Sequence, residues 1–266
     1  MTNHTPSIQV IERMGQLLDA VARYDEPASL KVLSADTGLH PSTAFRILAS
    51  LAGLGYVERN EAAHYGLGAK LMYLGGRVSA RGDVRQQAKG VMEELRNTLG
   101  ESINLTVRKG DEVVYIERAT TSRMIRVEQV IGGHAPLHVT AVGKLMLGEL
   151  GEQACREYAR RTGLPAFTPN TRADVNALIQ DVNTSTHRGY ALDDEEAEQG
   201  VGCIGVLVRD SSGIVVAGLS VSAPIERRKD EWIPRVMEAG RRLSERLGYY
   251  QNDQKGNAQA GLAAAK

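Results

Sequence analysis

The sequence predicts an α+β protein of two domains, and three observations lead to this fold class. At about 150 residues per domain, its 266 residues suit two domains or one large one. Apolar residues recur at helical spacing in the first quarter of the chain, where two short strand-like runs follow the helices. The rest of the chain mixes strand-like and helical segments, as in a sheet with helices packed on it.

Three short helices open the chain. The first is expected over residues 8–23, where apolar residues repeat at helical spacing. Ser29 is placed to cap a second helix, which ends at the turn begun by Gly38. Pro41 suits the first position of a third helix, which stops at residues 53–55.

A β-hairpin is predicted next, from strand-like runs at residues 56–59 and 64–67 around a polar turn. Helix, helix, turn, helix and hairpin is the order of a winged helix-turn-helix, so residues 1–67 are assigned to such a domain. Residues 68–80 are expected to form a linker helix, with a domain boundary near residue 80.

Residues 81–250 form the expected second domain. Its predicted strands cover residues 103–107, 113–118, 124–130, 201–209 and 214–222, and its predicted helices cover 141–150, 152–161, 173–187 and 230–247. Small and polar residues dominate after residue 250, so 251–266 are predicted to be a disordered tail.

Composition narrows the class of protein. A hydrophobic fraction of 42% and a charged fraction of 24% exclude collagen-like, coiled-coil and wholly disordered chains. The longest apolar run, residues 201–208, is less than half of the ~20 residues that a spanning helix needs, and residues 1–10 do not resemble a signal peptide. Only Cys155 and Cys203 are present, too few for a disulfide framework. We expect a soluble cytoplasmic protein with no membrane partner.

Net charge does not favour a nucleic-acid partner. The 32 basic and 32 acidic side chains of the chain cancel, and so do the seven of each kind in residues 1–79. Because phosphate contacts supply most nonspecific DNA affinity, this balance counts against nucleic-acid binding.

The third helix nevertheless begins with groups that bind DNA. Ser42, Thr43 and Arg46 lie in its first turn and a half, where hydroxyls, a guanidinium and free N–H groups meet phosphates or base edges. The alternative is that the hydroxyls only cap the helix and that Arg46 is a solvated charge. The hairpin favours DNA, and the further candidate contacts are His40, Arg59, His64 and Tyr65.

Several motifs, in order, resemble IclR-family bacterial transcription regulators. In the first domain they are LHPSTAFRIL at 39–48, GYV at 55–57 and YGLG at 65–68. In the second domain they are GG at 132–133, PLH at 136–138, GK at 143–144, GYALDDEE at 189–196 and LSVSAP at 219–224. The resemblance covers about residues 8–249.

The resemblance implies a ligand-responsive DNA-binding regulator of a catabolic operon, either a repressor or an activator, and not an enzyme. It implies a homodimer or homotetramer on double-stranded operator DNA, a small organic acid as effector, and no cofactor. The second domain is then an α/β effector-binding domain with a curved antiparallel sheet of the GAF-like kind.

Two features of the second domain suit a ligand. Thr140 is placed to cap the helix that begins at Ala141, which leaves the first N–H groups of that helix free to bind a carboxylate. Ser220 and Ser222 are two apart on a strand and share one face. By resemblance, the residues that line the effector pocket are Met124, Val127, Ala135, Ala141, Val142, Asp193, Val201, Cys203, Ser220 and Ser222.

Plainer roles are open for these side chains. The two serines can simply face solvent, Cys203 can be a small buried hydrophobe, and Asp193 can cap a turn. Because an ionised Asp193 repels a carboxylate, we expect Asp193 to bond a ligand hydroxyl, to bind through water, or to be protonated.

Two other functions compete with a regulator. One is a hydrolase with Cys203 or Ser220 as nucleophile, beside His138 and Asp193, although the chain has no Gly-x-Ser-x-Gly elbow. The other is a ligand-sensing module without DNA binding, which the neutral first domain would suit.

Metal binding is not expected. The acidic run 193–198 has no His or Cys at ligand spacing and is interpreted as a solvated turn. A zinc site of His134, His138 and Cys155 is disfavoured because these residues lie on separate predicted elements.

Overall fold

The computed structural model describes residues 8–79 and 83–250 of the chain, which belong to two compact units that divide between residues 81 and 82. The predicted boundary near residue 80 and the predicted tail at 251–266 lie outside the described ranges. Within those ranges, no helix has the length and apolar character needed to cross a membrane.

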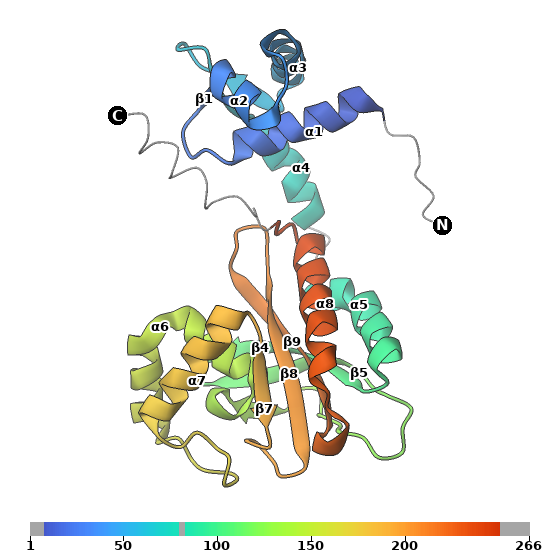
Figure 1. Cartoon of the computed structure of the whole chain (residues 1–266), viewed down its shortest axis with the longest axis vertical. Coiled ribbons are helices and arrows are strands. Elements are labelled where there is room, and N and C mark those ends of the chain that lie inside the picture. Colours follow the sequence, from blue (N-terminus) through green and yellow to red (C-terminus); the bar gives the residue numbers. More distant parts are fainter. Residues whose placement is uncertain (1–7, 80–82, 251–266) are drawn as a thin grey trace. The chain divides into compact units, whose positions relative to one another are not determined.

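The first unit contains three helices, a small antiparallel sheet and a further helix (Figure 1). The sheet has the strand order β1-β3-β2. In chain order the elements are α1 (Gln9–Ala22), β1 (Ala28–Ser29), α2 (Leu30–Thr37), α3 (Pro41–Gly53), β2 (Val57–Arg59), β3 (His64–Leu67) and α4 (Ala69–Ser79). The predicted winged helix-turn-helix order is confirmed.

Local signals in the sequence determine where these helices begin and end. The Ser29 side chain accepts a hydrogen bond from the Val32 N–H at 3.4 Å and caps α2. Gly38 ends the same helix with φ = 67°, a left-handed conformation that favours glycine. Pro41 occupies the first turn of α3, where its missing N–H costs nothing.

The second unit is built on a six-stranded antiparallel sheet with the strand order β6-β5-β4-β9-β8-β7. The strands are β4 (Ser102–Lys109), β5 (Glu112–Ala119), β6 (His134–Pro136), β7 (Ala191–Asp194), β8 (Val201–Arg209) and β9 (Val215–Pro224). The α-helices are α5 (Val84–Leu99), α6 (Ala141–Thr162), α7 (Val175–Arg188) and α8 (Ile233–Arg246), and short 3₁₀ turns cover Leu137–Val139, Ile225–Arg227 and Asp230–Trp232.

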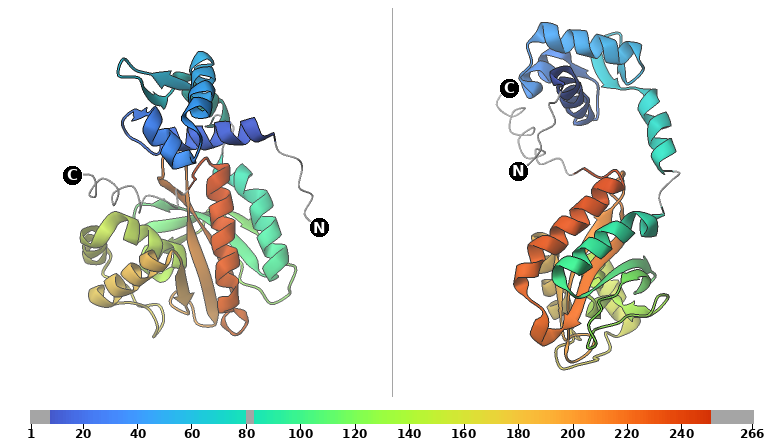
Figure 2. Two further views of the ribbon diagram at one scale, coloured as in Figure 1. Left: turned by 45° about the horizontal axis from the view of Figure 1, so that its top comes forward. Right: turned by 90° about the vertical axis from the view of Figure 1, so that its right-hand side faces the viewer.

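Helices cover both faces of this sheet (Figure 2). Since side chains alternate along a strand, Ile204, Val206 and Val208 of β8 pack with α5 and α8. Cys203 and Leu207 of the same strand face the other way and pack with α6. Apolar side chains of α7 pack in turn against those of α6. The expected α+β domain with an antiparallel sheet is confirmed.

The structure differs from the predicted elements in two places. Residues 120–133, which include the predicted strand at 124–130, form neither helix nor strand, and the strand that pairs with β5 on this side is β6. The predicted break between the helices at 141–150 and 152–161 is confirmed, because Gly151 inside α6 has non-helical backbone angles, φ = 83° and ψ = 169°. Helix α5, capped by the Asp83 side chain, was not predicted.

Candidate DNA interface and ligand pocket

The start of α3 presents polar groups at the surface of the first unit. His40 caps this helix: its Nδ1 accepts from the Ser42 N–H at 3.4 Å and lies 2.8 Å from the Ser42 Oγ. His40, Ser42 and Arg46 are exposed, and Thr43 is half-buried. Arg46 has no ion-pair partner among the residues that the structure describes. A free guanidinium one turn into a helix can reach a phosphate or a base edge.

The hairpin places two of its three candidate residues at the surface. Arg59 is exposed, with its guanidinium carbon 5.8 Å from the centre of the Tyr65 ring, and His64 is half-buried. Tyr65 is only 1% exposed, because β3 turns this side chain into the core of the unit. The buried Tyr65 side chain is therefore not available to contact DNA, and the prediction that it does so is wrong.

A row of polar side chains crosses the α6 face of the six-stranded sheet. The strand register places Asp193 of β7 opposite Cys203 of β8, and Cys203 opposite Ser222 of β9. The Cys203 Sγ lies 3.2 Å from the Ser222 Oγ, and the Asn104 Nδ2 of β4 donates to that Oγ at 3.1 Å. Ser220 stands two residues from Ser222, on the same face, and is buried. The structure thus brings together the predicted residues Asp193, Cys203, Ser220 and Ser222.

Asp193 is the one carboxylic acid among the residues named for this row, and its surroundings change its pKa. It is 3% exposed, and its Oδ1 accepts the N–H groups of Glu196 at 2.8 Å and Ala197 at 3.4 Å. Burial raises the pKa of the Asp193 carboxyl to about 7, and the nearby Glu196 carboxylate adds to this, while the two N–H groups and Lys144 oppose it. Asp193 therefore changes charge near neutral pH.

A buried lysine supports the turn that holds Asp193. Lys144 of α6 is 1% exposed, and its Nζ lies 2.6 Å from the Glu196 Oε1 and 2.8 Å from the Asp181 Oδ2. The Glu196 side chain is thereby fixed, and its own backbone N–H is the one that donates to Asp193. Lys144 thus stabilises the turn whose N–H groups donate to Asp193, and it affects the polar row through that turn.

The first turn of α6 lies against the same face of the sheet. The Thr140 Oγ1 accepts from the Gly143 N–H at 3.2 Å, as the sequence predicts for a cap. Ala141 packs against Cys203 and Ala191. The N–H groups of Ala141 and Val142 have no hydrogen-bond partner in the described part of the chain, so the positive end of the helix dipole is available beside the polar row.

Two glycines of the sheet make this close approach of α6 possible. A Cβ on Gly218 would lie 2.7 Å from the Val142 Cβ and 3.1 Å from the Thr106 Oγ1. A Cβ on Gly205 would lie 2.9 Å from the Val142 backbone nitrogen. Real side chains do not tolerate such distances, so the first turn of α6 occupies the space that these glycines leave.

We therefore expect Gly218→Ala to destabilise the protein by about 1–3 kcal/mol, because the added methyl group overpacks the contact with Val142. The measurement is urea unfolding of the variant beside the wild type. Gly90→Ala is the control, since Gly90 lies in α5 with its nearest atom at an ordinary 3.6 Å, and it should be neutral or slightly stabilising. Equal free energies of unfolding for Gly218→Ala and the wild type would contradict this packing.

Two further predicted pocket residues lie elsewhere. Met124 is 96% exposed, and Val127 is half-buried in the same irregular segment. The Ile125 carbonyl of that segment accepts a hydrogen bond from Arg227 at 2.8 Å, which keeps the segment close to the 3₁₀ turn after β9. The Met124 side chain is therefore surrounded by solvent and lines no pocket in the described part of the chain, so that prediction is wrong. The expectation for Val127 stays a prediction.

The other predicted lining residues occupy the α6 side of the sheet or its edges. Ala141 and Val142 are buried at the start of α6. Ala135 of β6 packs on the core cluster beneath α6. Val201 begins β8 and is half-buried.

Sequence reasoning missed Asn104 and Tyr115. Asn104 is 1% exposed and joins the polar row through Ser222. Tyr115 of β5 stands opposite Thr106 of β4, and burial raises the pKa of its hydroxyl, with smaller contributions from the charges of Cys203 and Asp193. The alternation of polar and apolar residues from 102 to 107 was the available signal for Asn104. No local pattern marks Tyr115.

The geometry does not favour a nucleophile. Burial raises the pKa of the Cys203 thiol well above its usual value, so the thiolate that attack requires is disfavoured. The His138 Nδ1 lies 2.7 Å from the Tyr158 hydroxyl, and its Nε2 lies 3.1 Å from the Pro165 carbonyl, so both ring nitrogens are engaged away from the row. Across residues 8–79 and 83–250, no group of three His, Cys, Asp or Glu could hold a metal ion.

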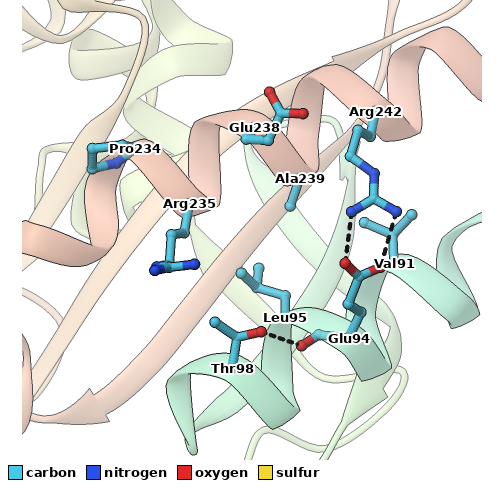
Figure 3. Close-up of a pocket in the computed structure, with 9 residues that line it drawn as sticks. All are labelled: Val91, Glu94, Leu95, Thr98, Pro234, Arg235, Glu238, Ala239 and Arg242. Carbon is cyan, nitrogen blue, oxygen red and sulfur yellow. Dashed lines mark hydrogen bonds and ion pairs between the residues drawn. The ribbon is translucent and has the colours of Figure 1, made fainter. Parts of the chain in front are cut away.

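A separate groove lies between α5 and α8, on the other face of the sheet (Figure 3). Its volume is about 280 Å³, and Glu94 and Arg242 form a two-point ion pair across it at 2.8 and 2.9 Å. The described residues that line this groove include none of the predicted ligand residues. The groove is therefore distinct from the candidate pocket.

A winged helix-turn-helix in one unit and a polar row beside a helix N-terminus in the other are the parts of a ligand-responsive DNA-binding regulator. Comparison with protein families agrees. The IclR helix-turn-helix domain matches residues 10–61, and the C-terminal domain of the bacterial transcriptional regulator IclR matches residues 77–248. The protein belongs to the IclR family of bacterial transcription regulators, as its motifs predict.

Individual relatives cover almost the whole chain. The HTH-type transcriptional regulator XynR of Escherichia coli is 35% identical over 249 residues, which are 92% of this chain and 99% of that protein. The crystal structure of the repressor BlcR of Agrobacterium tumefaciens has a TM-score of 0.74 at 25% identity and covers 93% of this chain and 100% of its own. An IclR homologue from Microbacterium hydrocarbonoxydans, solved with 4-hydroxybenzoate, has a TM-score of 0.58 at 24% identity. The match covers 90% of this chain and 98% of the homologue's chain. The family consists of transcription regulators, and the hydrolase alternative is set aside.

Proposed function

We propose that the effector of this regulator is a small organic acid, bound on the α6 face of the six-stranded sheet. The observation that carries the proposal is the placement of the free N–H groups at the start of α6 beside the row of Asp193, Cys203 and Ser222. A helix N-terminus favours a carboxylate. The solved homologue with 4-hydroxybenzoate holds an organic acid, which supports the same class of ligand.

Effector binding would then change the affinity of the helix-turn-helix domain for the operator of a catabolic operon. A coupling free energy of about 1–3 kcal/mol between the two sites changes affinity roughly 5–150-fold. The protein would bind a pseudo-palindromic site as a homodimer or homotetramer, because two recognition helices then read two half-sites. The linker helix at 68–80 is the segment through which the two sites would communicate.

The contacts with DNA would come from the start of α3 and from the hairpin. Ser42, Thr43 and His40 offer hydroxyl, ring and backbone groups to phosphates, and Arg46 is free to reach a base edge. Arg59 and His64 of the hairpin would contact the sugar-phosphate backbone.

Arg46→Ala is expected to weaken operator binding about tenfold, since one lost base or phosphate contact costs roughly 1–3 kcal/mol. Fluorescence anisotropy of the DNA upstream of the gene, titrated with wild-type and variant protein, measures this. Arg235→Ala is a matched control, because Arg235 is an exposed arginine of the second unit and lies outside the proposed interface.

A ligand-sensing module without DNA binding is the second candidate, and the balanced charge of residues 1–79 favours it. The same titration separates the two functions. Binding that weakens with rising salt and falls in Arg46→Ala supports the DNA-binding regulator. No salt-dependent binding by the wild type, or equal binding by Arg46→Ala and Arg235→Ala, would favour the sensing module.

A further inference from the structure

Phe45 is an aromatic side chain at the surface of α3 that the contacts proposed above do not use. It is 44% exposed, and it is not among the described side chains that form the core of the first unit. The chain has one other phenylalanine, Phe167 of the second unit. A phenyl ring exposed on a recognition helix is available to whatever that helix binds.

Phe45 shares the outer face of α3 with residues proposed to contact DNA. Ser42, Arg46 and Ala49 are three or four residues from Phe45 or from one another, so helical geometry places the four side chains side by side. All four are exposed. The buried residues of the helix are Ala44, Leu48 and Leu51. The outer face of α3 therefore has a polar part, Ser42 and Arg46, and an apolar part, Phe45 and Ala49.

This apolar part is separate from the apolar groove between α1 and α3. The described residues that line the groove include Val10, Ile11, Ile47 and Leu54, and Phe45 is not among them. A partner seated in the groove would therefore not account for the exposure of the Phe45 ring.

The major groove of DNA offers an apolar group to such a surface, the C5 methyl group of thymine. The other base edges present hydrogen-bonding atoms, to which the Ser42 hydroxyl and the Arg46 guanidinium are suited. A phenyl ring has neither a charge nor a hydrogen-bonding group to offer a phosphate. Phe45 is therefore suited to the selection of a base and not to general binding of the DNA backbone.

We infer that Phe45 contacts a thymine of each operator half-site, with its ring packed on the C5 methyl group in the major groove. The inference rests on the proposed DNA interface and adds to it a residue that determines base preference. The seven basic and seven acidic side chains of residues 1–79 cancel, which limits the affinity for DNA of any sequence. Base contacts then carry a larger share of the preference for the operator.

Removal of single methyl groups from the DNA tests this contact. Full-length protein first selects its preferred duplexes from a pool with a randomised central segment. Each recurring thymine of the selected site is then replaced by deoxyuridine, which lacks only the methyl group, and fluorescence anisotropy gives the dissociation constant. One such replacement should weaken binding by the wild type about 3–5-fold per half-site, the effect of one buried methyl group.

A double-mutant cycle assigns the methyl contact to Phe45. Phe45→Ala should bind the thymine duplex more weakly than the wild type does, and it should no longer distinguish this duplex from the deoxyuridine duplex. Phe45→Leu keeps an apolar side chain and should retain part of the discrimination. Phe167→Ala is the matched control, because Phe167 is 52% exposed and lies in the second unit, and it should discriminate as the wild type does.

Salt dependence separates a base contact from a phosphate contact. The dissociation constants of the wild type and of Phe45→Ala should change equally with salt concentration, since a phenyl ring displaces no counterion from DNA. A weaker salt dependence in Phe45→Ala would mean that the substitution removes phosphate contacts, and it would overturn the assignment.

The selection step distinguishes failure of the inference from failure of the proposed function. If the wild type selects no sequence from the pool, the proposed binding of an operator fails as well. If it selects a site in which no deoxyuridine replacement weakens binding, the inference alone is wrong. The same holds if the replacement weakens binding by the wild type and by Phe45→Ala equally.

Discussion

Lys144→Met is expected to destabilise the second unit by about 3–5 kcal/mol, because it leaves the buried Glu196 carboxylate without its cation and removes a partner of Asp181. Glu196 is 1% exposed, and its Oε2 already has no hydrogen-bond partner in the part of the chain that the structure describes. The turn that donates two N–H groups to Asp193 would lose its support as well. Urea unfolding of the variant and the wild type at pH 7 measures the change.

The control for this prediction lies in the same helix. Arg156 and Glu152 of α6 form an ion pair at 2.7 Å with side chains 46% and 53% exposed. Arg156→Met should therefore cost no more than about 0.5 kcal/mol, since solvent screens an exposed pair. If Lys144→Met cost as little as Arg156→Met, the buried ion pair would not hold the turn.

The second large effect concerns Asp193→Asn and pH. An Asp in an unfolded chain has a pKa near 3.9, and burial raises the pKa of Asp193 in the folded protein to about 7. The folded state therefore binds the proton more tightly, and the stability that this provides is complete below pH ~4 and is lost as the pH rises to about 7. A difference of roughly three pKa units corresponds to about 4 kcal/mol.

An asparagine at this position does not titrate. The free energy of unfolding of Asp193→Asn, relative to the wild type, should consequently rise by about 4 kcal/mol between pH 4 and pH 8. Thermal or urea unfolding at several pH values gives both curves, with Glu198→Gln as an exposed carboxylate control that should follow the wild type. Parallel curves for Asp193→Asn and the wild type would show that Asp193 keeps an ordinary pKa in the folded protein.

Much of the first unit was predictable because its signals are local. The cap at Ser29, the left-handed turn at Gly38 and Pro41 at the start of α3 each determine a helix end from neighbouring residues. Tyr65 was placed wrongly because β3 has only four residues, too few for alternation to show which face is buried. The ring enters the core, and Arg59 lies near it at the surface.

The second unit was less predictable where distant segments decide the structure. The run at 124–130 is apolar enough for a strand, but it forms none, and β6 is the strand that pairs with the start of β5. Helix α5 was missed although Asp83 and apolar residues at helical spacing marked it. The register of β7, β8 and β9 brings Asp193, Cys203 and Ser222 into one row, and only the family resemblance indicated this from the sequence.

Lys144 illustrates the limit of local reasoning. Its partners Asp181 and Glu196 are 37 and 52 residues away along the chain. A lysine in the first turn of a helix is ordinarily a surface charge, since a buried lysine is rare unless it is paired. Nothing in the neighbouring residues indicates the pairing, which depends on how α6, α7 and the turn after β7 meet.

The most direct measurement is the affinity of the full-length protein for the DNA upstream of its gene, with and without an acid that calorimetry shows to bind. We expect a saturating concentration of that acid to change the dissociation constant for this DNA roughly 5–150-fold in the wild type. The change should disappear in a Ser222→Ala variant that no longer binds the acid. An acid that binds the protein and leaves the affinity for DNA unchanged would contradict ligand-responsive regulation.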